Sequence, residues 1–245
     1  HNYFPFSRML IKFFLKSVDK YFVMSDNTFI QLKKIVSVKD IKQIFLPLKE
    51  NFGPTLNQVE CQKKLNIGSD FTMLFFGLIR DYKGLDVLLN SLVDFKKQIN
   101  DFKLIIAGEC YTQKNKYLDL INEYNLKSNI IWDESYILDE NVNVYFSACD
   151  VVVLPYKKAS QSGIIPISFN YNKIILASNI SGLKEFVILG KTGYLFENEN
   201  PISLSETLLE IYNNHDFNKS NKFISVYKER FTIDKLADDI MTFIG

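Results

Sequence analysis

From Thr72 onward the chain alternates short apolar runs with longer amphipathic stretches, and this alternation constrains the fold more than any other feature. The apolar runs are TMLFFG (72–77), KLIIAG (103–108), NIIW (129–132), DVVVLP (150–155), KIILAS (173–178) and GYLF (193–196). They lack alternation of apolar and polar residues, which predicts parallel strands buried on both faces. The amphipathic stretches predict helices over 85–99, 116–125, 140–149, 163–172 and 201–214. Strand–helix alternation of this kind predicts a doubly wound α/β domain.

The front of the chain follows a different pattern. The elements expected there are a helix, a strand and a helix, over 6–20, 19–25 and 27–36. The NFGP stretch (51–54) indicates a linker. We therefore expect residues 1–47 to be the C-terminal remnant of a separate domain, and residues 48–245 to form the main domain with a helix over 233–244 packing back. Because HNYFPFSRML has no initiator Met and is not a signal peptide, we expect the chain to be the back part of a longer protein.

Composition excludes several classes of protein. The formal net charge of +1 at pH 7 argues against a nucleic-acid partner. Cys61, Cys110 and Cys149 form no CxxC pair, which is typical of reduced thiols in a cytoplasmic protein. With only His1 and His215 as imidazoles, a histidine-based metal site is disfavoured, and neither a metal nor a cofactor is expected. No apolar run approaches the length of a membrane span.

Two cations follow the first predicted strand of the main domain, in FFGLIRDYKGLDVLL (75–89). The strand ends at Gly77, the loop carries Arg80 and Lys83, and Gly84 precedes the next helix. Ligands bind outside the carboxyl ends of the strands in such sheets, and two cations beside a helix start suit an anion such as a diphosphate. Solvated loop charges are the alternative.

Three further stretches follow in order, and they are KLIIAGE, SACDVVVLPY and NISGLKEFVILGKTGYLF. Together with FFGLIRDYKGLDVLL they resemble the donor-binding domain of the family 4 retaining glycosyltransferases (glycosyl transferases group 1), which have the two-domain GT-B fold. The resemblance covers roughly residues 70–200. It implies a Rossmann-like donor domain preceded by a remnant of the acceptor domain, with Arg80 and Lys83 holding the donor diphosphate. It also implies donor contacts at Gly77 and Glu109, and a place for His1 near the transferred sugar.

A loop of small residues, ASQSG, follows the strand that ends at Leu154. Small residues let a ligand approach the backbone, and unpaired N–H groups at a helix start favour negative charge. The resemblance implies that this loop meets the donor phosphates or sugar, through residues Ser160, Gln161, Ser162, Gly163 and Ile164. Ser162 is also positioned to cap the helix, so an ordinary capping turn is the alternative.

The loop also departs from the family pattern, which has two glutamates separated by seven residues. Ile167 and Ser168 stand near the place of the second glutamate, which normally binds the donor ribose. The chain resembles a bacterial polysaccharide-type subgroup that has PYxxAxQSG instead. Ribose recognition and the identity of the donor therefore stay open.

Other motifs carry less weight. The loop DESYI follows the third strand, where the family's loop borders the nucleotide base, so Ser135 and Tyr136 are candidate base contacts or parts of a plain connecting loop. GKT (190–192) is not a P-loop, because Glu185 stands where the first glycine of that motif belongs. The chain has neither GxGxxG nor Asp-x-Asp, which disfavours dinucleotide oxidoreductases and metal-dependent glycosyltransferases.

A cationic amphipathic pattern runs along the helix expected over 6–20. Arg8, Lys12, Lys16 and Lys20 recur at spacing four beside apolar residues that include Phe13. Such a helix suits an anionic membrane surface, which would make a cytoplasmic protein peripheral to the inner face of the cell membrane. Packing against a missing domain is the alternative.

The expected function is transfer of a sugar from a UDP- or GDP-sugar to a saccharide or lipid-linked acceptor, with retention and without a metal ion, in cell-surface polysaccharide synthesis. With most of the acceptor domain missing, we expect the chain itself to bind nucleotide weakly and not to turn over. The main alternative is a non-catalytic nucleotide-sugar-binding subunit that works with a partner chain. A sugar-phosphate epimerase or phosphorylase of related fold is a more distant one.

Overall fold

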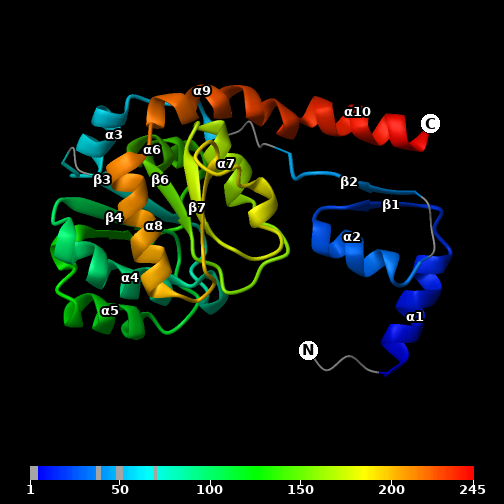
Figure 1. Cartoon of the computed structure of the whole chain (residues 1–245), viewed down its shortest axis with the longest axis horizontal. Coiled ribbons are helices and arrows are strands. Elements are labelled where there is room, and N and C mark those ends of the chain that lie inside the picture. Colours follow the sequence, from blue (N-terminus) through cyan, green and yellow to red (C-terminus); the bar gives the residue numbers. More distant parts are fainter. Residues whose placement is uncertain (1–4, 37–39, 48–51, 69–70) are drawn as a thin grey trace.

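The computed structural model describes residues 5–36, 40–47, 52–68 and 71–245. Its main body is a six-stranded, fully parallel sheet with the strand order β5-β4-β3-β6-β7-β8 (Figure 1). The strands are β3 (Phe71–Phe76), β4 (Phe102–Ala107), β5 (Ile130–Asp133), β6 (Val151–Leu154), β7 (Ile174–Ser178) and β8 (Gly193–Phe196). Each overlaps one of the predicted apolar runs to within one residue at its ends, and the predicted α/β doubly wound class is confirmed.

Helices cover both faces of this sheet (Figure 1). One layer consists of α5 (Lys114–Glu123), α4 (Leu85–Gln98) and α8 (Pro201–Asn214). The other contains α3 (Gln58–Lys64), α6 (Val142–Ala148), α7 (Ile164–Asn170) and α9 (Phe217–Tyr227). α4 shows why these segments form helices, since Leu85, Leu88, Leu89 and Leu92 recur at helical spacing and are fully buried.

The order of the strands positions the functional edge. The chain moves outward from β3 through β4 to β5, and then returns to pair β6 with the other side of β3. Met73 of β3 faces Val151 of β6 in this pairing, and both side chains are fully buried. The strand order therefore reverses between β3 and β6, and ligands of such sheets bind at the carboxyl ends of these two strands.

The front segment forms a small unit of its own. It consists of α1 (Pro5–Lys16), β1 (Lys20–Val23), α2 (Asp26–Lys33) and β2 (Asp40–Gln43), with β1 and β2 parallel. Among its described residues the buried apolar cluster is small, with Tyr21, Val23, Leu32 and Val36. β2 was not predicted, because its sequence DIKQ has no apolar run. That these residues belong to a separate domain stays a prediction.

The C-terminal helix α10 (Ile233–Ile244) extends from the main body along β2 and β1 (Figure 1). Lys42 Nζ contacts Asp239, with 3.1 Å to Oδ1 and 2.8 Å to the backbone carbonyl. Lys20 Nζ donates to the carbonyls of Phe243 and Ile244, at 2.7 and 2.9 Å. Lys20 thus pairs with two of the last carbonyls of the helix, which have no partner within it, and this stabilises its C-terminal end.

Candidate functional site

The loops after β3 and β6 meet at the point where the strand order reverses. Gly84 has φ +69°, and a Cβ added to it would lie 1.9 Å from the carbonyl oxygen of Pro155. Lys157 N–H donates to the carbonyl of Tyr82 across 2.8 Å, which joins the same two loops again. Lys157 also forms a 2.7 Å ion pair with Asp86 in the first turn of α4. The two loops thus form one surface at the carboxyl edge of the sheet.

Lys83 lies inside this surface. The residue is only 7% exposed, and its Nζ has a single long contact of 3.4 Å with the carbonyl of Phe76. Its ammonium also lies 5.7 Å from the centre of the Tyr156 ring. No carboxylate within the described ranges forms an ion pair with it. Burial, and then the charge of Arg80, lower the pKa of Lys83 to about 8. A buried cation without an anionic partner is costly, so this position suits an anionic ligand.

Gly77 and the start of α7 border the same ammonium. A Cβ on Gly77 would lie 3.0 Å from Lys83 Nζ and 3.5 Å from Ile164 Cδ1. The absence of a side chain at Gly77 therefore leaves the approach to Lys83 open. Gly77, Lys83 and Ile164, which were predicted as donor-binding residues, are brought together in the structure.

Arg80 lies on the exposed side of the site. Its guanidinium stacks over the Tyr111 ring, with 5.5 Å from Cζ to the ring centre. The Tyr111 hydroxyl in turn donates to Glu109 Oε2 at 2.9 Å. Residues after β4 thus hold the side chain of Arg80, close enough for its charge to lower the pKa of Lys83.

The ASQSG loop presents free backbone donors at the same edge. Within the described part of the chain, the amides of Ser160, Gln161, Ser162 and Gly163 have no acceptor. The Ile164 amide differs, because it donates to Ser162 Oγ across 3.2 Å. The N-cap residue of α7 is Gly163, so Ser162 lies one residue before the cap and accepts from the first amide of the helix. Ile164 N–H is thus used within the protein.

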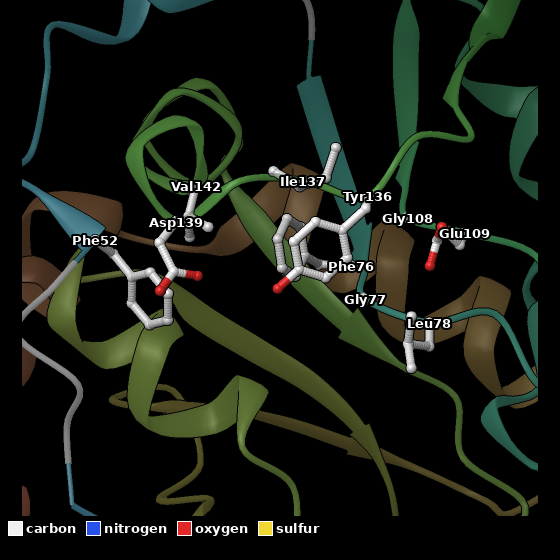
Figure 2. A pocket seen from close by; sticks show the side chains of 10 residues that line it. All are labelled: Phe52, Phe76, Gly77, Leu78, Gly108, Glu109, Tyr136, Ile137, Asp139 and Val142. Atoms are coloured by element: carbon white, nitrogen blue, oxygen red, sulfur yellow. The ribbon is translucent and has the colours of Figure 1, made fainter.

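A pocket of about 150 Å³ lies beside Gly77, at the ends of β3 and β4 (Figure 2). Its lining residues are Phe52, Phe76, Gly77, Leu78, Gly108, Glu109, Tyr136, Ile137, Asp139 and Val142. Of the predicted donor residues, Gly77, Glu109 and Tyr136 line this pocket. The contribution of Asp139 was missed, although it lies just after the predicted DESYI loop.

Ser135 does not line the pocket but fixes the loop that forms one wall. Its hydroxyl and its amide both donate to Asp133 Oδ1, at 2.5 and 3.0 Å. The Tyr145 hydroxyl donates to the other oxygen of the same carboxylate. Burial alone would raise the pKa of Asp133, but these hydrogen bonds outweigh burial and hold it below its ordinary value. Asp133 is therefore a fixed, ionised support for the loop that carries Tyr136.

Several predictions concern features away from this edge. The proposed sugar contact His1 lies outside the described residues. Across the described ranges, no group of three or more His, Cys, Asp or Glu side chains is arranged to hold a metal ion. No helix in those ranges has the length and apolar character needed to span a bilayer.

The model of the family Glycosyl transferases group 1 matches residues 57–230. The chain belongs to this family. The matched region contains the whole six-stranded sheet and both loops of the site. Lys83 and all lining residues of the pocket except Phe52 therefore lie within it.

The chain is also similar to individual glycosyltransferases and to solved structures. An uncharacterized glycosyltransferase of Methanocaldococcus jannaschii is 27% identical over 147 residues, which are 60% of this chain and 40% of the relative. A GDP-mannose:glycolipid 4-beta-D-mannosyltransferase of Xanthomonas campestris is 32% identical over 108 residues, 43% of this chain and 29% of the relative. HepE of Anabaena, solved with UDP-glucose, superimposes with a TM-score of 0.75 at 16% identity, over 93% of this chain and 64% of HepE. The chain thus spans 40% or less of these curated relatives.

Proposed function

We propose that this group 1 glycosyltransferase chain binds a nucleoside-diphosphate sugar. The intact protein transfers the sugar to a saccharide or lipid-linked acceptor in cell-surface polysaccharide synthesis, with retention and without a metal ion. The observation that carries the proposal is Lys83, a buried cation without a carboxylate partner among the described residues, at the edge where ligands bind. The names of two similar proteins agree with it, since one uses GDP-mannose and the other was solved with UDP-glucose.

In this proposal the protein stabilises the charge that develops on the leaving group. The bond from the anomeric carbon to the diphosphate oxygen breaks, and a bond to the acceptor hydroxyl oxygen forms on the same face of the sugar. The acceptor proton passes to the departing phosphate oxygen. Lys83, Arg80 and the free amides of Ser160 to Gly163 lower the barrier, because negative charge on the diphosphate increases in the transition state.

A non-catalytic nucleotide-sugar-binding subunit is a second candidate, favoured by one observation in α7. Near the place of the family's ribose-binding glutamate, Ser168 is fully buried and its hydroxyl donates to the carbonyl of Ile164 at 2.8 Å. Neither Ser168 nor Ile167 offers a carboxylate to the ribose. Release of nucleotide from UDP- or GDP-sugars by the intact protein would favour the enzyme, and tight binding without release would favour the subunit.

Titration calorimetry with UDP, GDP and ADP tests the binding site. We expect at least one of these nucleotides to bind, and Lys83→Ala to weaken it by roughly ten- to a hundred-fold, because charge-assisted hydrogen bonds are lost. Lys127→Ala is the matched control, since Lys127 is an exposed lysine just before β5, at the opposite edge of the sheet. If none of the nucleotides binds, or both variants behave alike, the proposal fails.

A peripheral position at an anionic membrane surface is the further part of this proposal. It is supported by α1, where Met9, Leu10, Phe13 and Phe14 are exposed beside Lys12 and Lys16. Phe13 alone is 74% exposed. A helix with exposed apolar residues and lysines suits the interface of an anionic bilayer.

A further inference from the structure

The pocket beside Gly77 combines apolar walls with two carboxylates. The side chains of Phe76, Ile137 and Val142 supply apolar surface, which suits the faces of a flat heteroaromatic ring. The carboxylates of Glu109 and Asp139 reach the pocket from opposite sides of the Tyr136 ring (Figure 2). A ring that binds here can therefore be recognised by its hydrogen-bond donors.

The pocket is continuous with the diphosphate position. Gly77 lines the pocket, and the same residue would bring a Cβ to within 3.0 Å of Lys83 Nζ. A nucleotide whose diphosphate contacts Lys83 therefore has its base within reach of the pocket. The assignment of this pocket to the base rests on the proposed function, in which the diphosphate contacts Lys83.

Of the two carboxylates, Asp139 is the one whose two oxygens are both free of a hydrogen bond from the described residues. Glu109 already accepts a hydrogen bond from Tyr111, at 2.9 Å. Within the described part of the chain, no residue donates to the carboxylate oxygens of Asp139. Its backbone is held in place, because its carbonyl accepts the amide of Val142, and Asn141 N–H donates to Leu138 at 2.8 Å.

The donor pattern of the base decides which nucleotide such a carboxylate favours. An ionised carboxylate only accepts hydrogen bonds, and it can accept two side by side. Guanine presents two adjacent donors, the N1–H and the 2-amino group. Uracil presents one N–H between two carbonyls, and adenine and cytosine present an amine beside a ring nitrogen that is itself an acceptor. Those acceptors repel the second carboxylate oxygen.

We propose that the carboxylate of Asp139 selects guanine in this pocket, so that the sugar donor is a GDP-sugar. The two N–H groups of guanine donate to the two oxygens of Asp139, while the ring lies against the apolar walls. Asp139 is a specificity-determining residue and has no role in the transfer step itself.

Titration of the chain with GDP, IDP, XDP, UDP and ADP tests this assignment. GDP is expected to bind roughly ten- to a hundred-fold more tightly than UDP or ADP, the range for one bidentate base contact. IDP, which lacks only the 2-amino group, is expected to fall between them. In Asp139→Asn one acceptor becomes an N–H donor, which matches the C2 carbonyl of xanthine. This variant is therefore expected to lose its preference for GDP and to gain one for XDP.

Glu140→Gln is the matched control, because Glu140 is exposed, adjacent in the chain and outside the pocket. It is expected to keep the preference for GDP. Retained UDP binding by Asp139→Asn would show that this variant is folded. If UDP binds as tightly as GDP, or if Asp139→Asn still prefers GDP, the assignment of Asp139 is wrong and the proposed function stands. If none of the nucleotides binds, the proposed function fails as well.

Discussion

Lys83 has its ammonium group in a buried position, which destabilises the charged form. Its burial therefore affects how the stability of the protein depends on pH. Burial lowers the pKa of Lys83 to about 8, below its ordinary value of 10.5. The unfolded chain therefore holds this proton more tightly than the folded one, so the unliganded protein gains stability as the pH rises from about 8 toward 10.5. A diphosphate reverses this preference, because it interacts only with the charged form.

The affinity for a nucleoside diphosphate is therefore expected to fall as the pH rises above about 8. Below the pKa of the free site Lys83 is charged and the affinity is constant. Above it the affinity declines by up to about ten-fold per pH unit, because binding must take up a proton. Calorimetry between about pH 7 and pH 9 measures this. Lys83→Arg stays charged throughout, so its affinity should be flat over the same range; an equal decline in both proteins would contradict the assignment.

Gly84 and Gly163 provide a matched pair at the two loops. Gly84→Ala would combine φ +69° with a Cβ 1.9 Å from the Pro155 carbonyl, so the free energy of unfolding should fall by more than about 2 kcal/mol. Gly163 has φ −67°, and its nearest neighbour would be Leu46 Cδ2 at 3.9 Å. Gly163→Ala should therefore change stability by less than about 1 kcal/mol. Urea denaturation compares them, and similar losses would refute the close approach of the two loops.

Sequence patterns predicted the cations of the site better than its pocket. Arg80 and Lys83 directly follow an apolar strand, so the rule on strand ends is enough to assign them to the functional edge. Phe52 was missed because only tertiary contacts bring the linker there, including the hydrogen bond from the Tyr171 hydroxyl to the Phe52 carbonyl, at 2.7 Å. Asp139 lies in a short 3-10 helix, whose side-chain direction no periodicity predicts.

At the scale of elements, the strands of the main sheet could be predicted because both of their faces are buried, which makes them apolar throughout. α3 and α9 were missed because their sequences, QVECQKK and FNKSNKFISVY, are mostly polar. Each nevertheless has an N-cap signal, since Asn57 accepts from the amide of Glu60 and Asp216 from that of Lys219. Capping residues would therefore have predicted the start of both helices.

α1 gives the prediction that belongs to a single element. The chain is expected to float with vesicles that contain phosphatidylglycerol, and less so at high salt. Lys12→Glu with Lys16→Glu should reduce the vesicle partition coefficient at least about ten-fold, since each basic residue near such a surface contributes about 1 kcal/mol. The control is Lys63→Glu with Lys64→Glu, which makes the same charge change on the exposed side of α3. Equal flotation of both double variants would remove the membrane from the proposal.

At the scale of the whole molecule, two cores of very different size are joined by a few contacts. The main core runs through all strands of the six-stranded sheet, whereas the described residues of the front unit bury a small cluster around Tyr21 and Leu32. Gln43 donates to Glu185 at 2.6 Å, and the Phe45 ring packs edge-on against Phe186. Together with α10, these contacts connect the front unit to the main body. A unit with so little buried apolar surface depends on its neighbour for stability.

Hydrogen exchange should therefore separate the two cores. Amides of β1 and β2 are expected to exchange faster than those of β3 and β6, because opening the front unit exposes little apolar surface. GDP at about a hundred times its dissociation constant adds about 2.7 kcal/mol to the opening of elements that must unfold to release it. That slowing is expected in β3, β4 and β6 and not in β1 or β2, because the proposed nucleotide site lies in the main body. Equal protection of both units by GDP would contradict this, and would mean either that the two units open together or that part of the nucleotide site lies in the front segment.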